Sequence, residues 1–243
     1  MAPPKRNTGT GRWAIATFVL VHGAWHGGCC WKKVTPLLRA KGHEVFAPTL
    51  TGLGERAHLR KDSIGLGTHV QDIVNVLDYE DLQDVVLVGH SYGGMVISGA
   101  ADRVPGRIAH AVYVDAHVPA DGQSVIDILG FTRPGYETDQ WLDPIGTFGV
   151  EDGADLEWLK AKMTQHPTRA LREKVALSRP LEEQAFSRTY VLAEEQPLGP
   201  TFRQTSDRLA ADPRWRVTSL PTGHDIMVTM PVELTELLLS IAD

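Results

Sequence analysis

The chain has 243 residues, of which 42% are hydrophobic and 22% are charged, and its formal net charge is -6 at pH 7. This composition is typical of a globular protein, and the negative charge without a long basic run argues against nucleic acid and anionic membranes as partners. The two cysteines, Cys29 and Cys30, are adjacent. This spacing excludes a disulfide framework and favours a reducing, cytoplasmic location.

The first residues, 1–15, contain Pro, Gly, Thr and basic residues but lack the apolar stretch of a signal peptide. We expect a disordered tail or a remnant of expression cloning there. No run approaches the ~20 apolar residues that span a membrane.

Short apolar runs rich in β-branched residues alternate with helical patterns along the chain. This alternation predicts an α/β fold with a doubly wound, mostly parallel sheet and helices on both faces. Strands are predicted at residues 17–21, 44–48, 85–89, 108–116, 188–193 and 215–220, and helices at residues 34–42, 68–77, 95–101 and from 231 onward.

The helix over residues 68–77 carries Val70, Ile73, Val74 and Leu77 on one stripe. Thr68 and Gln71 have the spacing of a capping box, which predicts that the helix begins near Thr68.

Residues 119–186 are rich in Gly, Pro, Asp and Trp and contain helical stretches but no strand pattern. An insertion of this kind between two strands of a parallel sheet is expected to form a helical lid over the carboxyl ends of the strands, where ligands bind. The predicted α/β core therefore consists of residues 16–118 and 187–243, and the predicted lid of residues 119–186.

The sequence Gly89-His90-Ser91-Tyr92-Gly93 follows the apolar run VVLV and precedes a small-residue helix. A sharp turn from strand to helix forces the serine into a strained conformation and presents its Oγ at the edge of the sheet. The backbone N–H of Tyr92, at the start of the helix, points to the same place. Ser91 is therefore the predicted nucleophile.

A serine nucleophile needs a base, and the chain has 10 histidines. His224 is the best candidate because it follows the last predicted strand, at the same end of the sheet as Ser91. His117 also follows a strand end and approaches the site, but its position does not suit a base. The others are expected on the surface, in packing, or beside the backbone of the site.

The loop after the first predicted strand, in VLVHGAWHGG, is expected to supply a second oxyanion donor, the amide of Ala24, beside that of Tyr92. His22 and His26 are four residues apart, but they lie on a strand end and a glycine loop without a third ligand in register. No metal site is predicted there.

At these residues the chain resembles the α/β-hydrolase superfamily, and more narrowly the small plant methyl esterase and hydroxynitrile lyase group with its bacterial relatives. The segments FVLVHGAWHGG, PLLRAKGHEVFAPTLTGLG, VVLVGHSYGGM and GHDIMV stand in the order of that group. The resemblance implies a Ser–His–acid triad, a helical cap and no cofactor.

The acid of the triad has two candidates. The superfamily usually places it after the strand that follows the lid, where this chain has Glu194 and Glu195 but no aspartate. Some relatives, similar to haloalkane dehalogenases, place it after the strand that follows the nucleophile helix, where Asp115 ends an apolar strand. A carboxylate there needs a partner, which a histidine Nδ1–H can provide. Asp115 is favoured and Glu195 is the alternative.

These groups predict a serine hydrolase that transfers an acyl group to water, and the resemblance implies esters of small alcohols, especially methyl esters. A methyl carbamate is an option because a bacterial relative cleaves the methyl carbamate of a benzimidazole fungicide, and a lactone is another. A hydroxynitrile lyase is a further alternative. Lyases of the resembling group carry a Thr after the first-strand His and a Lys after the catalytic His, whereas this chain has Gly23 and Asp225, which disfavours a lyase. A receptor without catalytic activity is the remaining alternative.

The substrate is expected to be a small molecule, and the protein a monomer or a homodimer. Aromatic residues of the lid are expected either to line an apolar pocket or to form the lid's own core. Predicted pocket residues are His22, Trp25, His90, Trp141 and Trp158, and Phe131 and Tyr136 are further aromatic candidates.

Overall fold

The structure of the protein is a computed structural model that describes residues 15–130, 132, 134–151, 153–195 and 197–242. The predicted tail therefore lies outside the described residues, except for Ile15, whose side chain is exposed.

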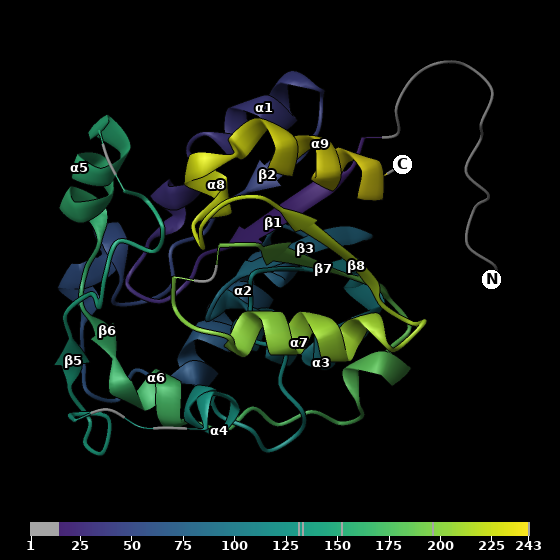
Figure 1. The fold of residues 1–243 in the computed structure, drawn as a ribbon. Helices are drawn as coiled ribbons and strands as arrows, with labels where there is room; N and C mark the ends of the chain where they lie inside the picture. The colour runs from purple at the N-terminus through teal and green to yellow at the C-terminus, as the bar shows by residue number, and fades with distance from the viewer. Residues whose placement is uncertain (1–14, 131, 133, 152, 196, 243) are drawn as a thin grey trace, which may run out of the picture.

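A single six-stranded parallel sheet forms the centre of the molecule (Figure 1), with the strand order β2-β1-β3-β4-β7-β8. Because every neighbouring pair is parallel, all carboxyl ends of the strands lie at one edge. The predicted doubly wound α/β sheet is confirmed. The strands are β1 (Thr17–Val21), β2 (Glu44–Phe46), β3 (Val85–His90), β4 (Ile108–Val114), β7 (Ser187–Ala193) and β8 (Arg216–Leu220).

Alternate residues of the strands point to opposite faces of the sheet, and helices bury both faces. Phe18 and Leu20 of β1 belong to the apolar cluster on the face with α1 (Val34–Ala40), α8 (Ile226–Thr229) and α9 (Pro231–Ala242). Val19 and Val21 belong to the cluster on the other face (Figure 1). That face is covered by α2 (Leu66–Tyr79), α3 (Gly93–Arg103) and α7 (Thr201–Ala210).

Helix α2 does not have the predicted capping box. It begins at Leu66 after the extended residue Gly65, so Thr68 already lies inside the helix. The carboxylate of Glu173 accepts the backbone N–H of Gly67 at 2.9 Å. The start of the helix is thus stabilised by a residue 106 positions away in sequence, which local spacing does not indicate.

The segment between β4 and β7 contains α4 (Val125–Leu129), α5 (Gly153–Lys162) and α6 (Thr168–Arg172). It also contains β5 (Trp141–Leu142) and β6 (His166–Pro167), which pair as a two-stranded antiparallel sheet. The prediction that this segment has no strands is therefore wrong. Strands of two residues are too short to show an alternating pattern, and their partners are more than 20 residues apart in sequence.

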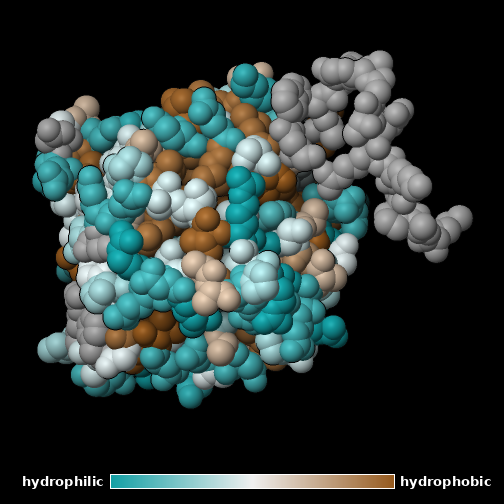
Figure 2. Space-filling view, turned by 45° about the vertical axis from the view of Figure 1, so that its right-hand side comes forward, coloured by the Kyte–Doolittle hydropathy of each residue, from teal (hydrophilic) through white to brown (hydrophobic). Residues whose placement is uncertain are grey.

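Short 3₁₀ helices complete the described elements at η1 (Gly28–Trp31), η2 (Gly54–Leu59), η3 (Pro105–Arg107) and η4 (Leu181–Glu183). On the face shown in Figure 2, hydrophilic residues alternate with smaller hydrophobic areas. Among the described residues, no helix combines the length and the apolar character needed to cross a bilayer.

The contact between α3 and the chain that follows β4 leaves no room for a side chain at Gly94. A Cβ there would lie 2.2 Å from the carbonyl oxygen of His117 and 3.0 Å from the Cβ of Ala116. We expect Gly94→Ala to lower the free energy of unfolding by about 2 kcal/mol or more, because backbone atoms must move apart. Urea unfolding measures this loss.

Gly106→Ala is the matched control, because a Cβ at Gly106 meets no atom within 4 Å. Its effect should stay within about 0.5 kcal/mol. Equal stability of the two variants would contradict the close contact at Gly94.

Candidate active site

Ser91 occupies the turn between β3 and α3 and has a left-handed backbone with φ 53°. Non-glycine residues rarely adopt this conformation, and it costs about 1–3 kcal/mol. The turn is held by the N–H of Ser91, which donates to Val114, and by the N–H groups of Gly94 and His117, which donate to the carbonyl of Ser91. A Cβ at Gly93 would lie 2.7 Å from the carbonyl oxygen of Val21. The local sequence thus permits the strained turn that presents Ser91.

His224 and Asp115 form a buried hydrogen bond, in which Nδ1 of His224 lies 2.6 Å from Oδ2 of Asp115. Each side chain is only 1% exposed. Asp115 directly follows β4 and has φ 40°, and its Oδ1 accepts the backbone N–H of Ala193 at 3.1 Å. The alternative acid, Glu195, has an exposed side chain. The structure therefore brings together His224 and Asp115, and not His224 and Glu195.

The backbone N–H groups of Ala24 and Tyr92 share one property. Neither donates a hydrogen bond within the part of the chain that the structure describes. Both residues are buried, and both line the same cavity as Ser91. Buried N–H groups without partners are uncommon, so these two are candidates to bind a developing negative charge.

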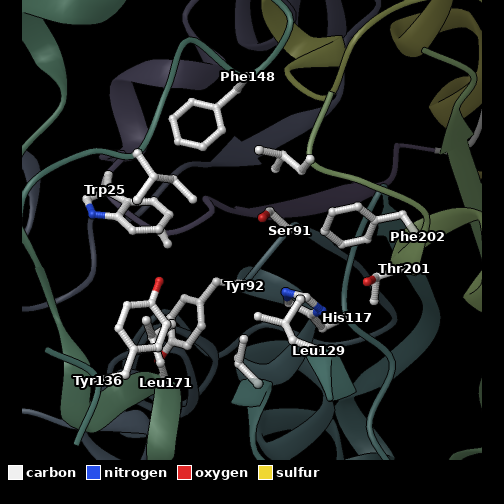
Figure 3. A pocket seen from close by; sticks show the side chains of 14 residues that line it. Trp25, Ser91, Tyr92, His117, Leu129, Tyr136, Phe148, Leu171, Thr201 and Phe202 are labelled. Atoms are coloured by element: carbon white, nitrogen blue, oxygen red, sulfur yellow. The ribbon is translucent and has the colours of Figure 1, made fainter. Parts of the chain in front are cut away.

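An apolar cavity opens at Ser91 (Figure 3). The predicted lid segment supplies one wall, and residues at the start of α7 supply another. The lining residues are Ala24, Trp25, Ser91, Tyr92, His117, Val125, Leu129, Tyr136, Ile145, Phe148, Leu171, Leu198, Thr201 and Phe202. Of the five predicted pocket residues only Trp25 lines this cavity. The further candidate Tyr136 lines it too, and Phe131 lies outside the described residues.

The other four predicted pocket residues contact protein instead. The ring of His22 bonds to the backbone of Gly23 and Leu50, and Nε2 of His90 donates to the carbonyl of His224 at 3.1 Å. The two tryptophans of the predicted lid contact cationic side chains instead: Arg60 lies over the ring of Trp141, and the Lys32 ammonium lies 3.8 Å from the ring centre of Trp158. Residue type alone does not distinguish these roles.

Several histidines around the site are buried in the neutral form. Burial lowers the pKa of His22 to about 3 and that of His69 to about 4. Burial, together with the neighbouring His224, lowers the pKa of His90 well below its ordinary range. His69 accepts the hydroxyl hydrogen of Tyr92 at Nδ1, since its Nε2 donates to the carbonyl of Thr51.

His26 is the exception, because both of its ring nitrogens face acceptors. Nδ1 lies 2.7 Å from the carbonyl oxygen of Ala24, and Nε2 lies 3.0 Å from Oδ2 of Asp225. Burial alone would lower the pKa of His26, but the Asp225 carboxylate and the Ala24 carbonyl raise it above its ordinary value. His26 and Asp225 thus form a buried ion pair that connects the loop of Ala24 to the residue after His224. Across the described ranges, no group of three or more His, Cys, Asp or Glu residues is arranged to hold a metal ion.

Several residues of the cavity are not predicted from the sequence. Phe148 and Phe202 lie in loops or at a helix start without periodicity, and each packs near the ring of His224, at 6.0 Å and 4.9 Å between centres. The pairing of His26 with Asp225 was also missed, because it joins residues 199 positions apart. No local signal indicates these contacts.

The parallel sheet, with Ser91, Asp115 and His224 following the carboxyl ends of its strands, is typical of an α/β hydrolase. Residues 18–237 match the family model described as alpha/beta hydrolase family, and the chain belongs to that family. The resemblance noted in the sequence is thereby confirmed.

The chain is also similar to individual members. It is 37% identical over 238 residues to a carbendazim hydrolyzing esterase from Nocardioides sp., covering 91% of this chain and 98% of that relative. Methylesterase 3 from Arabidopsis thaliana is 29% identical over 261 residues, which cover 93% of this chain and 95% of the relative. These comparisons confirm the predicted class of enzyme, a carboxylic ester hydrolase.

Among solved structures, the chain resembles an extracellular alpha/beta-hydrolase from a Paenibacillus species, described as sharing structural and functional homology with tobacco salicylic acid binding protein 2. The TM-score is 0.79 at 27% identity, and the match covers 93% of this chain and 98% of that chain. Tomato methylketone synthase I has the same fold, with a TM-score of 0.75 at 22% identity over 94% of this chain and 98% of its own.

The buried neutral histidines predict that the protein loses stability in mild acid. A histidine whose folded pKa lies below its unfolded value of about 6.5 stabilises the fold fully above pH 6.5, and this contribution is lost as the pH falls toward the folded pKa. For His22 and His69 this window extends from about 6.5 down to about 3 and about 4. Each then removes about 1.4 kcal/mol per pH unit. His26 acts in the opposite direction because its pKa is raised.

We expect the free energy of unfolding, measured in urea, to fall by several kcal/mol between pH 7.5 and 5.5. His69→Gln should lower by about one the number of protons that the protein takes up on unfolding in this pH range. His58→Gln, at an exposed histidine, should leave it unchanged. A wild-type stability that is flat over this range would contradict the neutral state of these groups.

Proposed function

We propose that this protein hydrolyses carboxylic esters of small alcohols, including methyl esters and methyl carbamates, through an acyl-enzyme on Ser91. The observation that carries the proposal is the 2.6 Å hydrogen bond between Nδ1 of His224 and Oδ2 of Asp115. It uses Nδ1–H for the carboxylate and leaves Nε2 as the basic nitrogen. Among the described residues, Nε2 of His224 has no hydrogen-bond partner, Ser91 Oγ included.

In the first half of the reaction, Ser91 Oγ attacks the carbonyl carbon while His224 takes the hydroxyl proton. The tetrahedral intermediate then collapses, and His224 delivers the proton to the departing alcohol. In the second half, His224 takes a proton from water, the resulting hydroxide attacks the acyl carbon, and Ser91 leaves with the proton back on its oxygen. Asp115 keeps the imidazole oriented and stabilises its charged form.

The N–H groups of Ala24 and Tyr92 are proposed to bind the oxyanion. Their lack of partners among the described residues supports this role. Ala24 is additionally held by His26, which accepts no hydrogen bond and donates to the carbonyl of Ala24. A donor that is fixed before the reaction begins needs no reorganisation when charge develops, and such donors are typically worth ~10²–10³ in rate each.

The cavity suits an aromatic acyl group, because Trp25, Tyr136, Phe148 and Phe202 contribute rings to it (Figure 3). The similarity to an esterase that hydrolyses carbendazim makes a methyl carbamate a candidate substrate. We propose that the segment between β4 and β7 acts as the lid of this cavity, since it contributes Tyr136 and Phe148.

Cys29 and Cys30, both free, agree with a cytoplasmic location.

Hydroxynitrile lyase activity is disfavoured by the residue that follows His224. The lyases of the resembling group have an ammonium group there, whereas Asp225 is a buried carboxylate paired with His26. A lactone would use the same oxyanion and nucleophile, so lactones belong in the substrate panel. Turnover of p-nitrophenyl acetate distinguishes the proposed enzyme from a receptor that only binds small molecules.

Ser91→Ala tests the nucleophile. We expect kcat/KM for p-nitrophenyl acetate to fall by at least ~10⁴, as in other serine triads, because the acyl-enzyme is proposed to form on the Ser91 hydroxyl. Circular dichroism serves as the control for folding. Hydrolysis at the wild-type rate in the folded variant would rule out the mechanism.

Asp115→Asn and Glu195→Gln test the acid as a matched pair of isosteric changes. The first should lower kcat by orders of magnitude, since the amide cannot hold the imidazole in the required tautomer. The second should change kcat less than threefold because the Glu195 side chain is exposed. The reverse order of effects would assign the acid to Glu195.

A further inference from the structure

His117 lines the same cavity as Ser91 (Figure 3). It follows the end of β4 by three residues, and its backbone N–H donates to the carbonyl of Ser91 at 3.1 Å. This bond fixes the backbone of His117 relative to the residue proposed to be the nucleophile. The side chain of His117 has no role in the proposed reaction.

The imidazole of His117 lacks the partners that the other histidines of the site possess. It is only 5% exposed, and its Nδ1 is buried without a hydrogen-bond partner. Neither ring nitrogen bonds to another residue in the described ranges. His90 and His166 also have one unpartnered nitrogen, but each uses its other nitrogen in a bond to the protein, and neither lines the cavity.

Such a group costs the folded protein free energy, because a buried donor or acceptor without a partner loses about 1–3 kcal/mol. A ring that only filled space would be better replaced by an apolar one. The adjacent ring of Phe202, 5.0 Å away between centres, holds the imidazole in place. A polar group that is fixed, buried and unpartnered in a substrate cavity is suited to recognition of a polar atom of the substrate.

The imidazole is also uncharged at neutral pH. Burial, followed by the electrostatic effect of the neighbouring His224, lowers the pKa of His117 to about 3. A neutral imidazole offers one donor and one acceptor but no positive charge. It therefore recognises a neutral polar atom rather than a carboxylate or phosphate.

We propose that His117 is a specificity-determining residue that hydrogen-bonds the nitrogen next to the scissile carbonyl of N-aryl methyl carbamates. The inference rests on the proposed function and deepens it by naming the substrate feature. Simple esters carry no hydrogen-bonding atom at that position, so the interaction favours carbamates over esters of the same shape. Ser91 and His117 line the same cavity, and the backbone hydrogen bond between them fixes their relative positions in the chain.

Two substrates of nearly equal shape test this inference. Methyl N-phenylcarbamate and methyl phenylacetate differ by an NH in place of a CH₂ beside the carbonyl. The readout is the ratio of kcat/KM for the carbamate to that for the ester. The intrinsic reactivity of the two substrates cancels when this ratio is compared between variants.

We expect His117→Phe to lower the ratio at least ~10-fold, because one hydrogen bond in a desolvated site is worth about that much. His117→Gln, which keeps a neutral donor and acceptor, should restore much of it. His110→Phe is the matched control: His110 lies in β4 and bonds Thr189 Oγ1 away from the cavity, so the ratio should stay at the wild-type value.

An unchanged ratio in His117→Phe would overturn the inference, as would wild-type enzyme that hydrolyses the ester but not the carbamate. Both results leave the proposed hydrolysis of carboxylic esters intact, and the second removes methyl carbamates from the proposed substrates. Wild-type enzyme that hydrolyses neither substrate nor p-nitrophenyl acetate would instead overturn the proposed function, and the inference with it.

Discussion

The hydrogen bond between His224 and Asp115 is the contact on which the arrangement of the site depends. It joins the loop after the last strand, β8, to the end of β4, and the parallel order β4-β7-β8 is what brings these two chain ends to one edge. The carboxylate is almost fully buried, so each oxygen needs a donor: Oδ2 has the imidazole, and Oδ1 has the N–H of Ala193 in β7. Three neighbouring strands thus hold one carboxylate, and removing a partner would leave a buried charge uncompensated.

A second buried contact holds the same loop from the opposite side. Asp225 directly follows His224 and is paired with His26, which also donates to the carbonyl of Ala24. One charged imidazole therefore connects the proposed base to the proposed oxyanion donor. His90, next to Ser91 in the chain, donates to the carbonyl of His224 itself. Buried polar contacts between loops set the positions of the hydroxyl, the imidazole and the amides. Loops held at several points in this way provide the preorganised geometry that electrostatic catalysis needs.

Most local features of this protein could be predicted from the sequence, except the start of α2, and long-range contacts could not. The strands and the turn at Ser91 follow from apolar runs and from glycines within five residues, and Asp115 was recognisable as a carboxylate at the tip of an apolar strand. The bond between His26 and Asp225 spans 199 positions, so no local pattern encodes it. The tryptophans of the predicted lid show the same limit: Trp141 packs against Arg60 instead of lining the cavity, because an aromatic ring packs equally well in either place.

The charge state of the cavity bears on how the proposed reaction would end. The lining residues are apolar or neutral, as His117 is, and the nearby buried carboxylates of Asp115 and Asp225 are each paired with a histidine. A neutral ester or carbamate can enter such a cavity at little cost. Hydrolysis converts it to an anion, which loses its hydration there and finds no cation among the lining residues. The same desolvated surroundings that strengthen the oxyanion contacts therefore weaken the binding of the product, so recognition of substrate through neutral hydrogen bonds and shape is compatible with rapid release.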